Sequence, residues 1–420
     1  MNSRRVLWFI NKVPLAVGRT AGIPSVRGGW LDSYIEIMAA VADIDLTVAF
    51  PDSTEHASSI RIGGVTFVGL PTGDTGSGLG GVIRRWRHNV APPEVLTAAA
   101  RLVREVDPAL VHLHGADWTC YGLAVHDCGI PTVLSIQGSP TTILPLYLRG
   151  LDRHFLRSLS FEDFLKGRGP VHDYALMKAR AANEAIIMAS VNHIAGRTEW
   201  DRRLASIMAP QAVYHHCDEP MRLPFYQASW QADAAVPGRI VCIMSGDYLR
   251  KGVGTLLRAV GILRRAKPDI ALVLAGFPPE TESGRATMRH IRALGIESCV
   301  TVMGDIDAQA VASELIRASV FVSSSHCENG SNALSEAQLV GVPCVASCAG
   351  GMVTTADHGS AALLVQDGDA EALAGAVLSL INDPQAATAL GQRGRALATT
   401  RHNRDCILAQ ILSIYDTALA

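Results

Sequence analysis

Short apolar segments alternate with longer amphipathic ones along the chain, and the alternation forms two successive sets. Apolar runs of about 4–8 residues between helical patterns are typical of parallel strands that are covered on both faces. The expected strands of the first set are 5–10, 46–50, 65–70, 109–113, 132–136 and 191–195. Those of the second set are 240–244, 270–274, 300–303, 320–323, 344–346 and 362–365.

Helical patterns lie between these strands. We expect helices over 30–41, 94–106, 174–189, 253–265, 283–294, 308–317, 331–340 and 371–381. Residues 227–238 are polar, rich in alanine and end in Pro-Gly, which is typical of a linker. The sequence therefore predicts an α/β protein with two doubly wound, Rossmann-like domains facing a cleft, the first over 1–230 and the second over 236–403.

Composition narrows the class of function. Hydrophobic residues make up 48% of the 420 residues and charged ones 18%, which suffices for two sizeable cores. The 37 basic and 39 acidic side chains leave a net charge of −2, so an overall basic surface for nucleic acid is excluded. The nine cysteines include no C-x-x-C pair, and no leader peptide or long apolar span is evident. We therefore expect a cytoplasmic protein with reduced cysteines.

The loops that follow the strands are the candidate site, because ligands of doubly wound folds bind outside the carboxyl ends of the strands. Glu328 lies in such a loop, a helix begins near Ser331, and Glu336 follows eight residues after Glu328. A carboxylate accepts two hydroxyl hydrogen bonds, which suits a sugar, and a helix N-terminus attracts phosphate. Asn329 and Gly330 let the backbone approach a ligand closely. The alternative is that Glu328 is a solvated loop residue and Glu336 a surface residue.

The segment SSSHCENGSNALSEAQLVGVPCVASCAGG (323–351) resembles the donor-binding segment of the family 4 retaining glycosyltransferases. The likeness continues in order along nearly the whole chain. It includes RVLWFINKVP (5–14), RGG (27–29), DPALVHLHG (107–115), GIPTVLSIQG (129–138) and IVCIMSGDYLRKGVGTLLRAVGIL (240–263). The resemblance implies a GT-B fold, in which the first domain binds the acceptor and the second the nucleotide-sugar. It also implies that a helix over 404–420 packs back on the first domain.

The resemblance assigns roles to individual residues. Lys251 matches the lysine that neutralises the donor diphosphate and stabilises it as a leaving group. Glu328 matches the glutamate that binds the transferred sugar, and Glu336 the one that binds the ribose. Gly28 and Gly29 match a loop that lies against the diphosphate. The implied reaction is sugar transfer with retention, for which neither a metal nor a resident cofactor is required.

Two of the departures from the family pattern concern candidate site residues. The family places an arginine about five residues before the lysine, whereas here Arg250 directly precedes Lys251 and either takes over the anionic contact or points to solvent. Many members carry a histidine where this chain has Gln137, and an amide can bind a hydroxyl but cannot take a proton. His114 is the nearest candidate to replace that histidine, with a structural role as the alternative.

The acceptor side carries two basic clusters, which either dock an anionic membrane or a lipid-linked acceptor or are solvated helix faces. They are the segment Arg-Arg-Trp-Arg-His at 84–88 and the set Arg149, Arg153, Arg157, Lys166 and Arg168. Segment 196–227 resembles bacterial polysaccharide-assembly members of the family. We therefore expect a transferase of polysaccharide or glycoconjugate assembly that acts on a carbohydrate or lipid-linked acceptor, peripheral at the inner face of the membrane.

Three other patterns carry less weight. The G-x-G-x-x-G at 76–81 follows the third strand instead of the first, which argues against a dinucleotide site. The D-x-D pattern occurs three times in turns, and His215-His216-Cys217 lacks a fourth ligand, so we expect no metal. A sugar-nucleotide epimerase of the same architecture and an inactive binding or scaffold subunit remain alternatives, although the paired glutamates followed by Gly-x-Pro argue against the epimerase.

Overall fold

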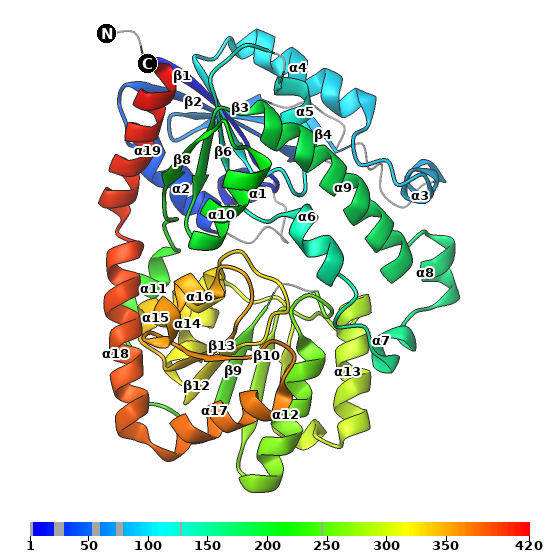
Figure 1. Ribbon diagram of the computed structural model, residues 1–420, viewed down its shortest axis with the longest axis vertical. Coiled ribbons are helices and arrows are strands. Elements are labelled where there is room, and N and C mark those ends of the chain that lie inside the picture. Colours follow the sequence, from blue (N-terminus) through cyan, green and yellow to red (C-terminus); the bar gives the residue numbers. More distant parts are fainter. Residues whose placement is uncertain (1–2, 21–28, 53–58, 73–78, 127, 245–246) are drawn as a thin grey trace. The chain divides into compact units, whose positions relative to one another are not determined.

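The computed structural model describes residues 3–20, 29–52, 59–72, 79–126, 128–244 and 247–420 (Figure 1). Its contacts divide the chain into two compact units. Unit 1 consists of Met1–Pro145, Glu162–Pro220 and Asn403–Ala420, and unit 2 of Leu146–Phe161 and Met221–His402. Each unit contains one sheet with helices on both faces, which confirms the predicted pair of doubly wound α/β folds.

The sheet of unit 1 has eight strands in the order β3-β4-β2-β1-β5-β6-β7-β8. All neighbours are parallel except β3 and β4, and the strand order reverses between β1 and β5. The strands are β1 Arg4–Phe9, β2 Ile44–Asp52, β3 Ser59–Ile62, β4 Val65–Pro71, β5 Leu110–His114, β6 Thr132–Ser135, β7 His193–Gly196 and β8 Val213–His216.

Successive side chains of β1 point to opposite faces of the sheet, and apolar residues occupy both faces, so both are buried. Val6 and Trp8 belong to one core cluster, and Leu7 and Phe9 belong to the cluster on the opposite face. Helices α2 and α19 cover the first face, and α4, α5, α9 and α10 contribute to the second. The helices of the unit are α1 Leu15–Thr20, α2 Trp30–Ala39, α3 Leu79–Trp86, α4 Pro93–Val106, α5 Tyr121–Val125, α6 Pro140–Ile143, α8 Phe161–Leu165, α9 Pro170–Ser190, α10 Glu199–Met208 and α19 Arg404–Leu419. Phe161, the first residue of α8, is assigned to unit 2.

The sheet of unit 2 has six parallel strands in the order β11-β10-β9-β12-β13-β14. Counted along this unit the order is 3-2-1-4-5-6, as in dinucleotide-binding folds, and it reverses between β9 and β12. The strands are β9 Arg239–Ile243, β10 Ala271–Ala275, β11 Val300–Met303, β12 Val320–Ser323, β13 Cys344–Ser347 and β14 Leu363–Val365.

Two core clusters lie on opposite faces of this second sheet. Helices α12, α13 and α17 contribute to one, and α11, α14 and α15 to the other. The helices are α7 Arg153–Leu156, α11 Leu223–Gln227, α12 Val253–Ala266, α13 Glu282–Leu294, α14 Ala308–Ile316, α15 Asn332–Val340, α16 Met352–Thr355, α17 Ala370–Asn382 and α18 Pro384–Arg401. Short 3₁₀ turns at Leu144–Leu146, Glu297–Cys299 and Asp357–Gly359 complete the chain.

The division into units differs from the expected boundaries at two segments. Residues 146–161 and 221–230, expected in the first domain, pack in unit 2. Phe155 lies in the same core cluster as Tyr248, and Phe225 and Trp230 lie in the cluster that contains α14 and α15. These segments pack in unit 2 because each of their aromatic side chains removes a large apolar area from water there, which stabilises the fold.

The C-terminal helix α19 belongs to unit 1, where Tyr415 is fully buried against the sheet. Its hydroxyl accepts a hydrogen bond from Trp8 Nε1 at 2.7 Å and lies 2.8 Å from His112 Nδ1. Through these two contacts the hydroxyl joins α19 to both β1 and β5. Within the described part of the chain, no helix is both long and apolar enough to span a bilayer.

Candidate functional site

The loops after β9 and β12 meet at the point where the strand order of unit 2 reverses. The His326 amide donates to the Arg250 carbonyl at 2.7 Å, and Ser324 Oγ donates to the Lys251 carbonyl at 3.1 Å. Gly252 has a φ of +64°, and a Cβ there would lie 2.1 Å from the Ser324 carbonyl oxygen. Only glycine satisfies both conditions, so this residue allows the two loops to lie in direct contact.

Lys251 and Glu328 face each other across these loops. Lys251 Nζ donates to Glu328 Oε2 at 2.5 Å, and both side chains are about five-sixths buried, with 16% and 15% exposed. Burial by itself raises the pKa of Glu328, but the adjacent Lys251 and Arg250 charges outweigh it and lower that pKa. Glu328 is therefore a carboxylate at neutral pH, held by a cation that could equally bind a phosphate.

Arg250 is the second cation of this site. Burial opposes its charge, yet the Asp247 and Glu328 carboxylates raise the pKa of the guanidinium above its usual value. Its Nε donates to Asp247 Oδ2, so the side chain is held in the loop and does not point freely to solvent. The structure thus brings together the two cations and the acidic residue that the sequence singled out.

The N-terminus of α15 lies directly after Glu328. Ser331 is the N-cap, and its Oγ accepts from the Leu334 amide at 3.3 Å. Asn329 and Gly330 are buried in the preceding loop, and the Glu328 carbonyl accepts from the Gly351 amide at 3.0 Å. The helix therefore presents its positive dipole end beside the Lys251–Glu328 pair.

Glu336, expected two turns into the helix, is 5% exposed and forms a bidentate ion pair with Arg222. Arg222 Nε and Nη2 donate to its two carboxylate oxygens, each at 2.8 Å. The alternative of a surface glutamate is therefore wrong, since this carboxylate is buried and paired. Arg222 was missed by the sequence analysis, because no local pattern connects residues so far apart in the chain.

Residues 229–397 match the family model described as Glycosyl transferases group 1. The match to the glycosyl transferases group 1 family therefore lies within unit 2. The GDP-mannose-dependent alpha-(1-6)-phosphatidylinositol monomannoside mannosyltransferase of Mycolicibacterium smegmatis is 29% identical over 308 residues, which cover 69% of this chain and 77% of the relative. A second relative, the MMP alpha-(1->4)-mannosyltransferase of Mycolicibacterium hassiacum, is 31% identical over 189 residues. That alignment spans 45% of each protein, slightly less than half of the relative's length.

Solved structures identify the fold of the chain. Sucrose-phosphate synthase from Thermosynechococcus elongatus superimposes with a TM-score of 0.74 at 18% identity, covering 99% of this chain and 98% of that one. Anabaena HepE in complex with UDP and glucose gives a TM-score of 0.66 at 15% identity, covering 98% and 99%. The predicted GT-B fold is confirmed.

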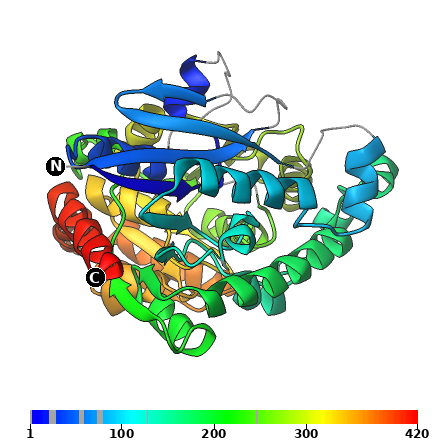
Figure 2. The ribbon, with the colours of Figure 1, turned by 90° about the horizontal axis from the view of Figure 1, so that it is seen from above.

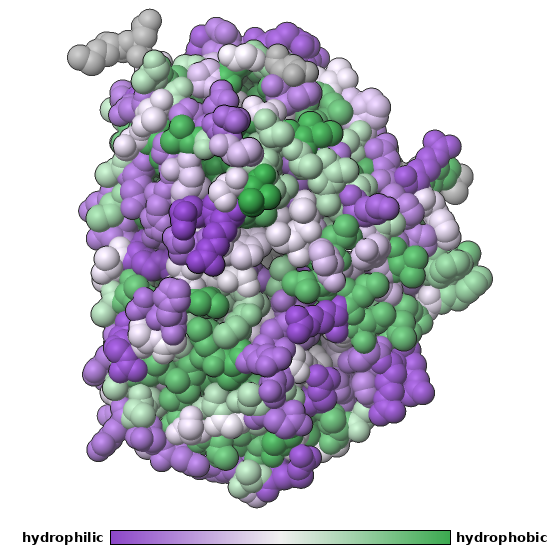
Figure 3. Space-filling model, in the orientation of Figure 1, coloured by the Kyte–Doolittle hydropathy of each residue, from purple (hydrophilic) through white to green (hydrophobic). Residues whose placement is uncertain are grey.

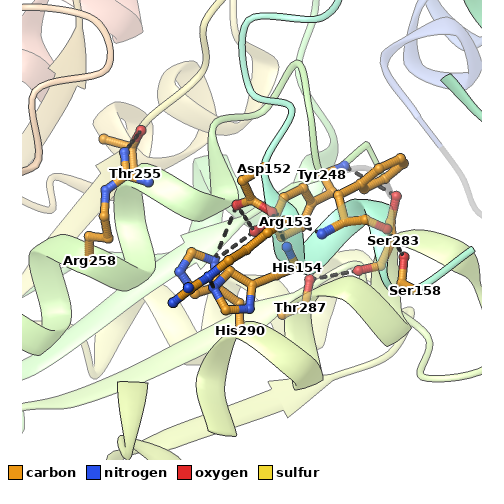
Figure 4. Close-up of polar contacts among 11 residues, drawn as sticks. Asp152, Arg153, His154, Ser158, Tyr248, Thr255, Arg258, Ser283, Thr287 and His290 are labelled. Atoms are coloured by element: carbon orange, nitrogen blue, oxygen red, sulfur yellow. Dashed lines mark hydrogen bonds and ion pairs between the residues drawn. The ribbon is translucent and has the colours of Figure 1, made fainter. Parts of the chain in front are cut away.

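A buried cluster supports the loop that contains Lys251 (Figure 4). The Tyr248 hydroxyl donates to Asp152 Oδ2 at 2.7 Å and lies 2.6 Å from His290 Nδ1. Because that hydroxyl gives its proton to the carboxylate, His290 Nδ1 is the donor in the second contact. Burial lowers the pKa of His290 to about 4, so the ring is neutral at pH 7. The His154 ring stacks on it with centroids 4.2 Å apart.

A second pair of contacts supports the loop that contains Glu328. His326 Nδ1 is hydrogen-bonded to Asp367 Oδ1, and Arg149 Nη1 lies 2.7 Å from the other Asp367 oxygen. These three residues line a cavity of about 440 Å³ that also reaches Cys348 and Gly350, at the carboxyl ends of β12, β13 and β14. No local pattern in the sequence marks any of these three residues as part of the donor site.

The expected residues of unit 1 lie at the carboxyl ends of β5 and β6. His114 is 1% exposed, and neither of its ring nitrogens has a hydrogen-bond partner among the described residues. Trp8 and His112 enclose it, with ring centroids 4.4 and 3.9 Å away. Burial, assisted by His112, lowers the pKa of His114 well below its usual range, so the imidazole is neutral. Gln137 Nε2 donates to Glu219 Oε1 at 2.7 Å, and Glu219 is paired with the buried Arg197.

Gly29 is the N-cap of α2, and a Cβ there would lie 2.2 Å from Lys12 Nζ. Lys12 lies in the loop after β1 and places a cation beside the expected diphosphate loop. This lysine was not predicted from the sequence. Gly28 and residues 76–78 of the glycine-rich motif lie outside the described residues. Within the described ranges, no group of three His, Cys, Asp or Glu side chains is arranged to hold a metal ion.

Proposed function

We propose that this glycosyltransferase transfers mannose from GDP-mannose to a hydroxyl of a lipid-linked acceptor, with retention of configuration. The observation that carries the proposal is the Lys251–Glu328 pair, buried at the strand-order reversal of unit 2 beside the α15 N-terminus. The mannosyl donor and the lipid acceptor follow from the relatives, several of which are named GDP-mannose-dependent phosphatidylinositol monomannoside mannosyltransferases.

In the proposed donor complex, the diphosphate replaces Glu328 as the partner of Lys251. Arg250 and the positive end of the α15 helix dipole add to the electrostatic stabilisation of the phosphates. Glu328 is then free to accept hydroxyl groups of the mannose. Glu336 binds the ribose, because Arg222 holds its carboxylate in place and carboxylate oxygens are good acceptors for hydroxyl groups.

The chemical step breaks the bond between the anomeric carbon and the phosphate oxygen and forms a bond to the acceptor oxygen on the same face. The acceptor proton passes to the departing phosphate, because Gln137 cannot take a proton and His114 is enclosed with a strongly lowered pKa. Lys251 lowers the barrier by stabilising the charge on the leaving diphosphate.

A lipid-linked acceptor implies that the protein works at a membrane surface, so we include peripheral contact with the inner face of the membrane in the proposal. An inactive scaffold would bind the donor without turnover, and an epimerase would convert it without any acceptor. Both alternatives are separated from a transferase by following the sugar label as well as donor binding.

Thermal unfolding with GDP-mannose, UDP-glucose and ADP-glucose tests the donor site. A ligand at 100 times its Kd stabilises a protein by about 2.7 kcal/mol, which shifts the Tm by several degrees. We expect such a shift with GDP-mannose that Lys251→Ala abolishes, because hydrogen bonds to charged groups contribute about 1.5–3 kcal/mol, or roughly 10- to 150-fold in affinity. Lys267→Ala, at the C-terminus of α12, is the matched control.

Transfer is then measured with labelled GDP-mannose and phosphatidylinositol mannoside vesicles. Label in the lipid fraction supports the proposal. A shift with UDP-glucose alone would overturn the choice of donor, and no shift with any donor would overturn the site. Donor binding without transfer or conversion would favour the scaffold.

A further inference from the structure

Helix α8 is inverted relative to an ordinary surface helix. Asp163 is 8% exposed, whereas Phe161, Phe164 and Leu165 are 76%, 55% and 53% exposed. A helix of a water-soluble domain normally buries its apolar stripe and exposes its charges. In α8 the apolar side chains thus face outward while the carboxylate of Asp163 is buried. Burying a carboxylate costs free energy, so this arrangement is unfavourable for the helix alone.

The neighbouring elements continue this apolar surface. On α9, Val171 is 77% exposed while the adjacent His172 is buried, and on α3 Ile83 and Trp86 are 45% and 42% exposed. The long helix α9 reaches the outlying helix α3, as Figure 2 shows from above. In Figure 3, hydrophobic side chains gather over α8 at the right-hand edge of the molecule.

Direct contacts make α3 and α8 one surface. Trp86 Nε1 donates to the Leu165 carbonyl at 3.1 Å, and Arg85 Nε donates to the Lys166 carbonyl at 2.7 Å. The Trp86 and Phe164 rings pack edge to face with centroids 5.5 Å apart. We define the α3–α8 surface as Ile83, Trp86, Phe161, Phe164, Leu165, Val171 and Tyr174.

The rim of the α3–α8 surface is basic. Arg87, Arg168 and Lys178 are exposed around it. The acidic residue Glu162 is exposed too, but it is paired with Lys166. Aromatic and aliphatic side chains flanked by arginine and lysine are the composition of protein surfaces that bind anionic lipid bilayers.

We propose that the α3–α8 surface docks this protein on an anionic lipid bilayer. Phe161 and Val171, its most exposed members, enter the boundary between headgroups and acyl chains, while Arg87, Arg168 and Lys178 contact anionic headgroups. This inference deepens the proposed function by naming the surface that meets the membrane, and it rests on that function only for the lipid nature of the acceptor.

Co-sedimentation of the full chain with vesicles tests the proposal. The vesicles contain either phosphatidylcholine alone or phosphatidylcholine mixed with phosphatidylglycerol. The double variant Phe161→Ser, Val171→Ser removes two side chains that bury little area in the folded protein, so the fold should persist. We expect its partitioning onto the anionic vesicles to fall about tenfold, since two large apolar side chains no longer enter the bilayer.

Matched controls distinguish this effect from a general loss of apolar surface. Ile207 on α10 and Val213 on β8 are 81% and 51% exposed, and the variant Ile207→Ser, Val213→Ser should bind vesicles like the wild type. Replacing Arg168 and Lys178 by glutamine should weaken binding several-fold on anionic vesicles only, with the difference shrinking at high salt.

Three outcomes would overturn the docking surface. They are no binding of the wild type to anionic vesicles, equal binding of the surface variant and its control, and self-association that the surface variant abolishes in place of vesicle binding. The donor-induced shift in Tm is measured on the same samples. A variant that loses vesicle binding but keeps this shift supports docking, whereas a wild type that binds vesicles but no donor refutes the proposed function alone.

Discussion

Lys251 and Glu328 hold each other's charge, which gives the candidate site a defined geometry. The Glu328 carboxylate keeps the Lys251 ammonium over the loop. In the proposed donor complex the lysine side chain therefore needs little rearrangement to meet the diphosphate. In the proposed donor complex the phosphate displaces Glu328, so the two anions compete for Lys251. We regard this exchange as the reason why one carboxylate can serve both as a placeholder and as a ligand for the sugar.

His290 makes the folded protein sensitive to acid. Its pKa in the folded chain is about 4, because of burial, against an ordinary value of 6.5. Between these values the unfolded chain binds a proton that the folded chain does not, so the free energy of unfolding falls as the pH is lowered from 6.5 to 4. His290→Asn keeps a donor for Tyr248 and removes this titration. We expect it to reduce the acid-induced loss by an amount on the order of 2 kcal/mol.

Denaturant unfolding at several pH values between 6.5 and 4 measures this effect. His126→Asn, at an exposed position, is the control and should lose stability with acid as the wild type does. Equal pH dependence of His290→Asn and the wild type would show that this histidine does not titrate as its burial implies.

At the scale of elements, the site depends on the contact between the loops after β9 and β12. Gly252 and Gly295 both have a φ of +64°, but an added Cβ meets the Ser324 carbonyl at 2.1 Å at Gly252 and nothing within 4 Å at Gly295. Alanine at either position costs about 1 kcal/mol of backbone strain. Only Gly252→Ala also separates the two loops.

We therefore expect Gly252→Ala to reduce donor affinity at least tenfold in calorimetry, while Gly295→Ala leaves it within twofold of the wild type. The two variants share the backbone penalty, so their difference isolates the loop contact. Equal affinities would mean that the loops adapt and that the alignment of Lys251 with Glu328 does not depend on this glycine.

At the scale of the whole molecule, the last helix completes unit 1 although it follows the last residue of unit 2. Tyr415 joins α19 to the sheet through Trp8 and His112. Tyr415→Phe leaves a buried indole N–H and a buried ring nitrogen unpaired, which should cost about 2–4 kcal/mol. Urea unfolding followed by tryptophan fluorescence measures the loss, with Tyr174→Phe, at an exposed tyrosine, as the control. A midpoint unchanged by Tyr415→Phe would show that α19 is held by its apolar contacts alone.

Most strands and the start of the helix near Ser331 were predicted well from the sequence, because they depend on residues that are close together in the chain. All twelve expected strands are present, and the helix near Ser331 begins where its N-cap residue indicates. Two short strands, β3 and β8, were missed because neither is a run of buried apolar residues. Helix α18 was missed for a related reason, since its polar and small residues obscure the helical period.

The two α/β sheets, the family likeness and the loop positions of Lys251 and Glu328 were predictable from the sequence. Hydrophobic period and helix capping depend on residues that are close together in the chain, so they can be recognised before the fold is known. The contact partners of the buried charged side chains are evident only from the tertiary structure. Arg222 pairs with Glu336, Asp152 meets Tyr248, and the apolar face of α8 points outward. These outcomes depend on strand order and packing, which bring together residues that are distant in the chain and leave no local trace in the sequence.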